Sequence, residues 1–337
     1  MRLPVEIGIG IQTDKEPGRY GELARLAEQH GIDVVSVFSD LLFQPPIGAL
    51  LEMARATERV RLGAAGWNPF TLHPYEISGQ VALLDAASDG RAYLGLVKGT
   101  WLGAIGVAQP KPVAQLREAV AVIYALLGGS GDAVEGEFFP LQAGTRLRYP
   151  VLRAAPPLLL GSWGPLGVAL AGRIADELKI GGTANPDLVP VMRERLAVGA
   201  RRAGRDAEDV RLVFGAVTVV DRDGEAARAV ARREVAMYLD AVGELDPTVT
   251  IEPELLEEVR ARLSEDDHER AGALVPDALL DRFCFSGTPV QVAAQAQALI
   301  DAGVDRVEFG TPHGMLDDAA GIELLGREVL PLLRRDR

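Results

Sequence analysis

Short apolar runs alternate with longer stretches of helical periodicity along most of the chain. This alternation predicts βα units with parallel strands. Eight units are expected, and eight is the number at which a parallel sheet closes into a barrel. The expected strands are Val5–Ile11, Asp33–Phe38, Arg61–Gly66, Ala92–Val97, Leu158–Gly161, Glu177–Ile180, Val210–Val220 and Arg306–Phe309. The expected helices are Gly18–His30, Gly48–Arg59, Pro74–Ala87, Val113–Leu127, Pro165–Gly172, Pro186–Ala203, Gly224–Val242 and Ala319–Leu333.

The prediction is therefore one (β/α)8 TIM-barrel domain over residues 1–337, with its active site at the C-terminal ends of the strands. The rival arrangement is an open, doubly wound sheet, which would place a Gly-x-Gly-x-x-Gly turn after the first strand. The stretch from Gly8 to Thr13 lies within the expected strand and lacks the third glycine. The open sheet is therefore disfavoured.

Two segments interrupt the alternation, at about residues 128–153 and 247–285. The first carries two β-like pieces, Ala133–Leu141 and Thr145–Tyr149, which predict a hairpin. The second is highly charged and predicts helices at Glu254–Ser264 and Pro276–Phe283. Both segments could be surface decoration, but inserted segments of barrels often cover the strand ends and shape access to them.

Charge and composition exclude several classes of partner. The net charge is −13 over 337 residues, which disfavours binding to nucleic acid or to an anionic membrane. Cys284 is the single cysteine, so no intrachain disulfide can form. The four histidines are scattered without metal-ligand spacing, and no metal is expected. We find no apolar signal core and no run near the roughly 20 apolar residues of a membrane span, so a cytoplasmic protein is expected.

Two glycine-rich turns precede expected helices and could hold a phosphate. Gly161-Ser162-Trp163-Gly164 follows the fifth strand, and Gly181-Gly182-Thr183 follows the sixth. Glycines let backbone N–H groups approach an anion, and a helix N-terminus carries partial positive charge. Turns and helix caps use the same residue types, but the adjacent pair favours a phosphate cradle.

Two lysines lie at or near these strand ends. Lys98 ends the fourth strand, beside Gly99 and Thr100, where it could neutralise a phosphate as a point charge. Lys179 lies within the sixth strand, on the face opposite Leu178 and Ile180. Alternation leaves two interpretations for Lys179, because it could point into the barrel towards a ligand or outward between the helices.

The second and third strands end in contrasting residues. Small residues around Gly66 leave room for a flat ligand against the backbone, although close packing would explain them equally. Asp40 follows the second strand and could act as an acid or base, position a substrate, or cap the loop. His73 precedes Pro74 at a helix start and is expected to be a structural cap.

An ordered set of short motifs gives the chain a family resemblance. The chain resembles the luciferase-like superfamily of flavin and deazaflavin oxidoreductases, and most of all its methylenetetrahydromethanopterin reductase type, which uses coenzyme F420. The matching stretches are Leu62-Gly63 through Asn68-Pro69, Leu83-Leu84-Asp85 through Gly90-Arg91, Gly161–Pro165, Ala171-Gly172, Asn185-Pro186, Ser286–Pro289 and Gly310-Thr311-Pro312.

The resemblance implies a barrel that carries F420, or alternatively FMN, at its strand ends, in a protein that forms a homodimer. It implies a non-proline cis peptide at Ala65-Gly66 behind the cofactor ring. The residues that it implies for cofactor binding are Ser39, Ala65, Gly66, Asn68, Lys98, Gly99, Thr100, Gly161, Ser162, Trp163, Gly164, Gly181, Gly182 and Thr183.

The chain also departs from that family. Members often keep Asp-His after the second strand, where this chain has Ser39-Asp40. The reductases carry acidic residues after strands one and four, where Gly10 and Thr100 stand here. Asp40 is therefore the candidate catalytic residue. Tryptophans near the strand ends suggest an aromatic wall, for which core packing is the competing explanation. The candidate substrate contacts are Trp67, Trp101 and His313.

The resulting hypothesis is an F420-dependent oxidoreductase that transfers hydride between the deazaflavin C5 and a small organic substrate. An FMN-dependent luciferase-like monooxygenase is the alternative on the same barrel. A cofactor-free barrel acting on phosphorylated sugars would need a lysine or glutamate inside the barrel, for which Lys179 is the candidate. A non-catalytic flavin-binding carrier is the alternative of another class.

Overall fold

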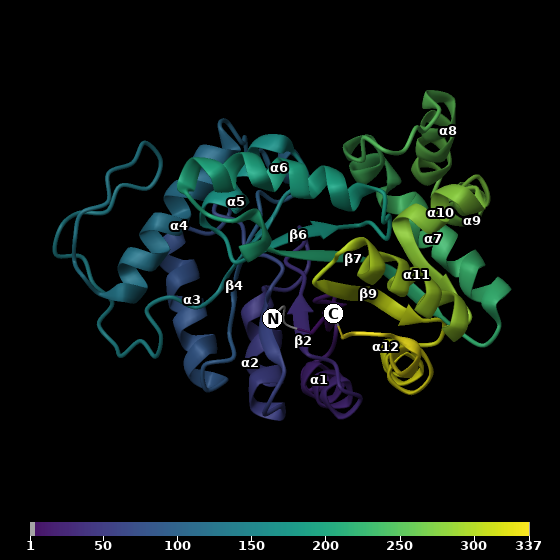
Figure 1. The fold of residues 1–337 in the computed structure, drawn as a ribbon, viewed down its shortest axis with the longest axis horizontal. Coiled ribbons are helices and arrows are strands. Elements are labelled where there is room, and N and C mark those ends of the chain that lie inside the picture. The colour runs from purple at the N-terminus through teal and green to yellow at the C-terminus, as the bar shows by residue number, and fades with distance from the viewer. Residues whose placement is uncertain (1–3, 337) are drawn as a thin grey trace.

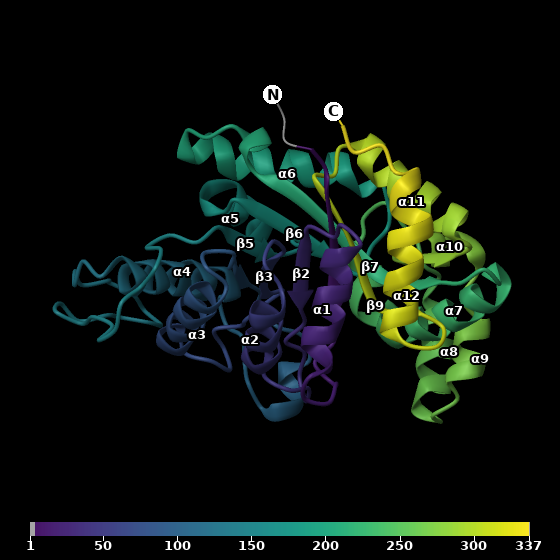
Figure 2. The same cartoon turned by 90° about the horizontal axis from the view of Figure 1, so that it is seen from below.

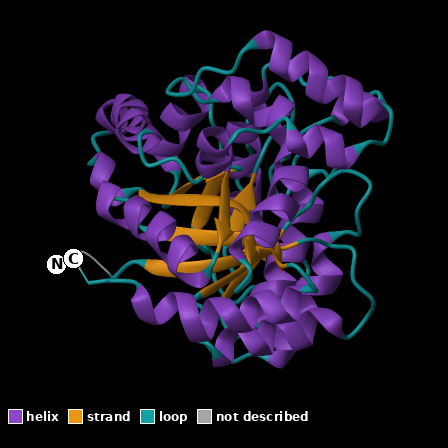
Figure 3. Cartoon of the chain, turned by 90° about the vertical axis from the view of Figure 1, so that its right-hand side faces the viewer, coloured by secondary structure: helices purple, strands orange, loops and turns teal. Residues whose placement is uncertain are grey.

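The computed structural model describes residues 4–336, in which parallel strands form a central barrel surrounded by helices (Figures 1 and 3). The hydrogen-bonded order of its strands is β3-β2-β1-β9-β7-β6-β5-β4. Isolated bridges pair Leu62 with Ala92 and Trp67 with Leu96, and so close β3 onto β4. The strands are β1 Glu6–Ile11, β2 Val34–Val37, β3 Arg61–Ala64, β4 Leu94–Leu96, β5 Leu158–Gly161, β6 Glu177–Gly181, β7 Arg211–Val220, β8 Cys284–Gly287 and β9 Arg306–Gly314. The predicted barrel is confirmed.

Strand β8 is an addition that the sequence pattern did not predict. It pairs in parallel with the second half of β7, from Val217–Cys284 to Val220–Gly287, and does not take part in closing the barrel. Helix α10 (Asp277–Phe283) ends directly before this strand. Four residues without a preceding turn give no separate apolar run, which explains why the pattern merged them with the helical segment.

Helices begin with proline at six positions. Proline is the first residue of α2, α3, α4, α5, α8 and α11. Its missing N–H costs nothing there, because the first amides of a helix have no intrahelical acceptor. The helices are α1 Arg19–Gln29, α2 Pro46–Ala56, α3 Pro74–Ala87, α4 Pro112–Gly128, α5 Pro165–Ile174, α6 Leu188–Ala203, α7 Gly224–Val242, α8 Pro253–Ser264, α9 His268–Ala273, α10 Asp277–Phe283, α11 Pro289–Ala302 and α12 Asp318–Leu324.

The last predicted helix, Ala319–Leu333, is wrong as a continuous α-helix. Helix α12 ends at Leu324, a π-helical turn runs over Leu325–Val329, and a 3-10 turn follows over Leu330–Leu332. Proline at position 331 cannot donate an intrahelical hydrogen bond, which accounts for the tightening at the end.

The two faces of the strands are filled differently. Outward residues such as Ile7, Ile9 and Ile11 are fully buried against the helices. The interior holds a smaller apolar cluster of Val34, Tyr93, Leu159 and Val213, together with several glycines. A Cβ on Gly63 would lie 2.6 Å from the Tyr93 ring. Glycine is therefore needed where a large side chain from another strand fills the barrel.

Five charged side chains close the N-terminal end of the barrel, and we call them the N-terminal charge layer. Arg61 Nη2 lies 2.6 Å from Glu6 Oε2 and 2.8 Å from Glu177 Oε1. Arg306 Nη1 lies 2.8 Å from Glu177 Oε2, and Arg211 Nη1 lies 2.9 Å from Glu6 Oε2. These ion pairs join strands β1, β3, β6, β7 and β9 across the barrel axis.

The two inserted segments project from opposite ends of the molecule (Figures 1 and 2). The predicted hairpin of Ala133–Leu141 with Thr145–Tyr149 in the first is wrong, because Thr145–Tyr149 forms no strand and lies in loop and bend. A single bridge, Val134–Leu141, is its β-structure. A side chain from α4 holds this segment instead of a second strand. The Glu118 carboxylate accepts a hydrogen bond from the Phe138 amide at 2.8 Å. In the second segment, α8 and α10 confirm the predicted helices within one residue.

The two ends of the described chain lie side by side (Figure 3), and the Val5 amide donates to the Arg335 carbonyl at 3.0 Å. None of the helices within residues 4–336 is both long and apolar enough to cross a membrane.

Candidate active site

The loops that follow the barrel strands gather most of the predicted site residues at one end of the barrel. We call this end the barrel mouth and define it by residues 12–18, 38–45, 65–73, 97–111, 161–164, 181–187 and 310–317. Active sites of this fold are built from such loops.

The backbones of strands β3 and β4 approach very closely at the mouth. The Ala65-Gly66 peptide bond is cis, as the resemblance implied. A Cβ on Gly66 would lie 2.7 Å from the Gly95 carbonyl oxygen, and one on Gly95 would lie 1.9 Å from the Ala64 carbonyl oxygen. Larger side chains are therefore excluded at Gly66 and Gly95, and Ala65 beside them is half-buried.

Asn68 shapes the contact between the third and fourth loops. Its Oδ1 accepts the Phe70 amide at 3.2 Å and the Thr71 amide at 3.0 Å. Its Nδ2 would lie 3.1 Å from a Cβ on Gly99, a residue with φ of 77°. Glycine is required there by both the conformation and the space. Asn68 is buried, so its observed part is to hold this turn.

The fourth loop continues into exposed groups. Lys98 is exposed, and within the described chain it forms no ion pair, whereas Lys15, Lys111 and Lys179 each form at least one. Thr100 is exposed beside it. Trp101 has a positive φ of 58° and is 55 % exposed. This loop therefore offers an available cation and an open aromatic surface.

The tryptophans differ in what they present to the mouth. Trp67 is 1 % exposed, and its Nε1 donates to Gln80 Oε1 at 2.9 Å. Trp163 is half-buried, and its Nε1 donates to the Gly181 carbonyl at 3.0 Å. Trp101 presents the largest free indole surface of the three. The predicted substrate contact of Trp67 gains no support from its burial.

Asp40 is exposed at the mouth and is held by the first loop. Gln12 Nε2 donates to Asp40 Oδ2 at 2.9 Å, while Gln12 Oε1 accepts the Thr13 amide at 2.9 Å. The hydrogen bond from the Thr13 amide fixes the orientation of the Gln12 carboxamide, so the NH2 group of Gln12 points to Asp40. Ser39 is half-buried next to it. Asp40 is thus placed where a substrate could reach it.

The turn after β5 leaves the start of helix α5 open. Gly164 is the N-cap residue and Pro165 the first helical residue, and the first turn has no side-chain cap. A Cβ on Gly167 would lie 2.1 Å from Ser162 Oγ, so the Ser162 hydroxyl lies against that turn. Uncapped amides and a hydroxyl at a helix start are suited to an anion.

The turn after β6 is different, because its donors are already used within the protein. The Gly182 and Thr183 amides both donate to the Gly215 carbonyl, at 2.7 and 3.1 Å. Thr183 is fully buried, and its hydroxyl donates to the Arg282 carbonyl at 3.2 Å. The predicted phosphate contacts of Gly182 and Thr183 gain no support from this arrangement. Gly181 stays open, since no atom lies within 4 Å of a Cβ placed on it.

Lys179 points into the barrel, which decides between its two interpretations. Its Nζ pairs with Glu308 Oε1, and both side chains are buried. Ser36 Oγ donates to Glu308 Oε2 at 2.8 Å and lies 2.8 Å from the Tyr93 hydroxyl. The Phe38 ring centroid is 5.4 Å from Lys179 Nζ. These residues form a polar column directly below the mouth.

The sequence reading did not single out Glu308, although a signal was present. Arg306-Val307-Glu308-Phe309 alternates charged and apolar residues, which places both charges on one face of a strand. In a barrel whose outer face is apolar, that face is the interior. Period two in the last strand could thus have identified the partner of Lys179.

His313, near the end of β9, lies in a buried cluster and not on the open surface of the mouth. Its Nδ1 is 2.9 Å from Asp318 Oδ1, and its Nε2 is 3.2 Å from the Phe309 carbonyl. Lys15 Nζ lies 3.1 Å from Asp318 Oδ2. Burial opposes ionisation of Asp318, but His313 and Lys15 outweigh it and lower its pKa. With both imidazole nitrogens engaged, a substrate contact of His313 gains no support.

Comparison with known proteins agrees with this geometry. Residues 1–306 match the model of the family described as luciferase-like monooxygenase. This chain belongs to that family.

Relatives and a solved structure match over nearly the whole chain. A 5,10-methylenetetrahydromethanopterin reductase of Archaeoglobus fulgidus is 30 % identical, with 98 % of this chain and 100 % of the relative covered. An F420-dependent glucose-6-phosphate dehydrogenase of Rhodococcus erythropolis is 27 % identical, with 98 % of each covered. The coenzyme F420-dependent tetrahydromethanopterin reductase of Methanopyrus kandleri superposes with a TM-score of 0.89 at 26 % identity, with 98 % of this chain and all of that chain covered.

The histidines of this family member have structural places, although His73 is an exposed residue of the third mouth loop. His73 caps helix α3, as predicted, because its Nδ1 accepts the Tyr75 amide at 3.1 Å. His30 follows α1 and packs near Gly326, and His268 begins α9 in the second inserted segment. His313 is the buried partner of Asp318. The open acid-base group of the second loop is therefore Asp40.

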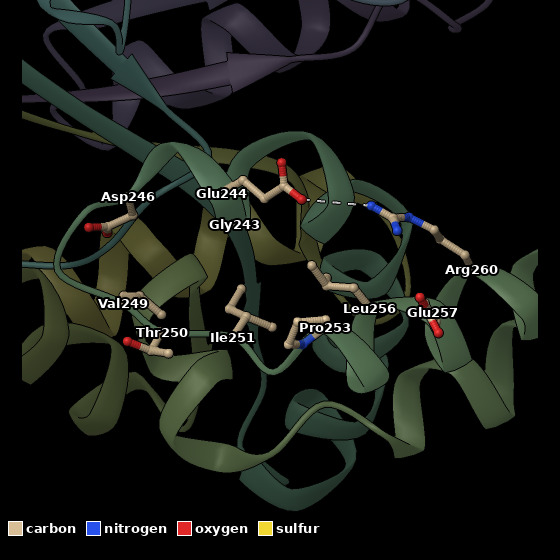
Figure 4. Close-up of a pocket in the computed structure, with 10 residues that line it drawn as sticks. All are labelled: Gly243, Glu244, Asp246, Val249, Thr250, Ile251, Pro253, Leu256, Glu257 and Arg260. Carbon is tan, nitrogen blue, oxygen red and sulfur yellow. Dashed lines mark ion pairs between the residues drawn. The ribbon is translucent and has the colours of Figure 1, made fainter.

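A separate pocket lies in the second inserted segment, between the end of α7 and helix α8 (Figure 4). It borders the mouth through Asp246, whose carboxylate accepts from Asn185 Nδ2 at 2.8 Å. Its rim carries the 3.9 Å pair of Arg260 with Glu244. No barrel strand ends in this pocket, so we do not regard it as the active site. Within residues 4–336 no group of three or more His, Cys, Asp or Glu is placed to hold a metal ion.

Proposed function

We propose that this protein is an F420-dependent oxidoreductase that transfers hydride between the deazaflavin C5 and a small organic substrate. The observation that carries the proposal is the mouth itself, where the Ala65-Gly66 backbone, which has no room for a side chain at Gly66, and the uncapped start of α5 both lie at the C-terminal ends of barrel strands. A flat ring and a phosphate need such a pair of surfaces. The names of the glucose-6-phosphate dehydrogenase and of the solved reductase favour F420 over FMN.

The residues of the mouth fit such a cofactor. Ala65-Gly66 and Gly181 would face the ring, since neither places a bulky side chain in its way. The α5 amides, Ser162 and Lys98 would hold the phosphate, because they combine open donors with an available cation. When bound, the deazaflavin supplies the hydride chemistry, and the protein supplies orientation and electrostatics.

Asp40 is our candidate for the group that acts on the substrate. Gln12 holds it at 2.9 Å, so its second carboxylate oxygen can accept a proton or a hydrogen bond from a ligand in the mouth. Exposed apolar side chains ring the same opening, including Leu42 at 88 % and Leu316 at 86 % exposed. We propose that they and Trp101 exclude water around an organic substrate.

Ligand fluorescence tests the proposal, with purified protein titrated separately with F420 and FMN. We expect F420 to bind and FMN to bind more weakly. Replacement Lys98→Met should weaken F420 binding roughly tenfold, the effect of one charge-assisted hydrogen bond to a phosphate. Lys111→Met is the matched control, because this exposed lysine of the same loop pairs with Glu137 at 2.8 Å. Equal effects of the two replacements would contradict the proposed phosphate site.

The other outcomes select the alternatives. Preferred binding of FMN with oxygen-dependent turnover would favour the monooxygenase. F420 binding without turnover of any reducible substrate would favour a carrier. Binding of neither cofactor would leave the cofactor-free barrel, for which the buried Lys179–Glu308 pair supplies the required interior groups. A homodimer and a cytoplasmic location are further parts of the proposal, which size-exclusion chromatography and cell fractionation would test.

A further inference from the structure

Lys179 occupies the layer of the barrel interior directly below the mouth. It precedes Gly181 by two residues on β6, so both face the interior and lie about 7 Å apart along the strand. The position of a Cβ on Gly181 is open, with no atom within 4 Å. Phe38 is half-buried at the mouth, and its ring centroid lies 5.4 Å from Lys179 Nζ. The ammonium group therefore lies beneath the place proposed for the cofactor ring.

The interior ion pairs do not need Lys179 to balance their charge. In the connected set within residues 4–336, the carboxylates are those of Glu6, Glu177 and Glu308, and the cations are Arg61, Arg211, Arg306 and Lys179. Glu308 already faces Arg306 Nε at 3.7 Å. Lys179 is the additional cation, at the upper end of the column.

Burial and the surrounding groups act on this lysine in opposite directions. Burial lowers the pKa of Lys179, and the Glu308 carboxylate opposes that effect by its charge and its hydrogen bond. The Arg306 guanidinium also lowers the pKa, and Asp40 raises it. Glu308 thus favours the charged form of Lys179 against the effect of burial.

We propose that Lys179 is a positioning residue that sets positive charge beneath the cofactor ring and thereby favours the reduced form over the oxidised form. Hydride addition to a ring brings one unit of negative charge, which a fixed cation in a low-dielectric site stabilises. The inference rests on the proposed function. It goes beyond that function because it assigns the redox preference of the site to a residue that lies under the mouth.

The test compares the dissociation constants of oxidised and reduced F420 for the same protein. The oxidised form is titrated by fluorescence, and the reduced form is measured anaerobically by displacement of the oxidised form. For Lys179→Met we expect the preference for the reduced form to fall roughly fivefold, as for loss of one nearby charge in a partly screened site. Lys179→Arg should keep most of the preference. Lys98→Met should weaken both forms equally, because both carry the same phosphate.

An unchanged affinity ratio in Lys179→Met, with an unaltered circular dichroism spectrum, would overturn the proposal. Glu308→Gln gives an independent check, since it removes the carboxylate that favours the charged form of Lys179, and the preference for the reduced form should fall as in Lys179→Met. A shift in the opposite direction would also overturn the proposal. If the unmodified protein binds neither redox form of F420, the proposed function itself fails, and this inference fails with it.

Discussion

The two ends of the barrel show opposite uses of polar residues. At the N-terminal end, Arg306 is fully buried, and the carboxylates of Glu177 and Glu6 are matched by guanidinium groups within 3 Å. At the mouth, Lys98 is exposed and Asp40 has one neutral partner, Gln12. The charges at one end are paired within the protein, and Lys98 and Asp40 at the other end are available to a ligand.

The N-terminal end of the barrel therefore serves stability, and the mouth at the other end of the barrel axis serves ligand binding. A buried charge whose partners all belong to the protein can contribute to folding but cannot meet a substrate. An exposed charge contributes little to folding and is free to bind. Replacements at the N-terminal end should therefore change unfolding, and replacements at the mouth should change ligand binding.

The largest expected effect is that of Arg306→Met at the N-terminal end. Methionine fills similar space but removes the fully buried guanidinium that lies 2.8 Å from Glu177, so the free energy of unfolding should fall by about 3–5 kcal/mol. Urea unfolding followed by circular dichroism measures this. As control, Arg260→Met removes an exposed pair with Asp240 and should leave the urea midpoint nearly unchanged. Similar midpoints for the two variants would contradict the contrast between the two ends.

The second prediction concerns acid. Burial opposes ionisation of Glu177, but Arg306 and Arg61 outweigh it and lower its pKa from 4.5 to about 2. A carboxyl with a lowered folded-state pKa stabilises above its unfolded pKa, and that stability is lost as the pH falls towards the folded value. We expect a loss of about 3 kcal/mol between pH 5 and pH 2. In Glu177→Gln, urea unfolding over this range should show a correspondingly smaller pH dependence.

The alternation of residue types was enough to locate the barrel strands. All eight barrel strands lie where the apolar runs predicted them, although β9 continues past Phe309 to Gly314. Local signals also placed the predicted helix starts within two residues and indicated the turn at Gly164-Pro165, although α9 and α11 were not predicted. In these places a residue's role depends on its own neighbours in the chain.

Long-range partners could not be predicted in the same way. Lys179 and Glu308 are 129 residues apart, and either face of β6 was compatible with the pattern. The β6 turn resembles the β5 turn in sequence, yet its amide and hydroxyl donors already bind the carbonyl oxygens of Gly215 and Arg282. The burial of Trp67 and His313 likewise depends on distant elements. Composition identifies candidates, and packing decides which of them stay available.

The third prediction tests the mouth with a side chain added to open space. Gly181→Val should leave the unfolding free energy within about 1 kcal/mol, because no atom lies near the new Cβ and the residue is not among those with positive φ. F420 affinity should fall at least about tenfold, since the side chain fills the space proposed for the ring. Fluorescence titration measures this. Unchanged affinity would remove Gly181 from the proposed ring site.

The smallest effect on stability is expected for Asp40→Asn, the mouth counterpart of Glu177→Gln. Asp40 is exposed, and asparagine can still accept from Gln12, so unfolding should change by less than about 0.5 kcal/mol. F420 affinity should stay within about twofold, because Asp40 is assigned to the substrate and not to the phosphate. Turnover of any accepted substrate should fall at least about tenfold, because asparagine cannot take a proton. If turnover is unaltered, Asp40 is a loop residue, and the group that acts on the substrate lies in another of the mouth loops.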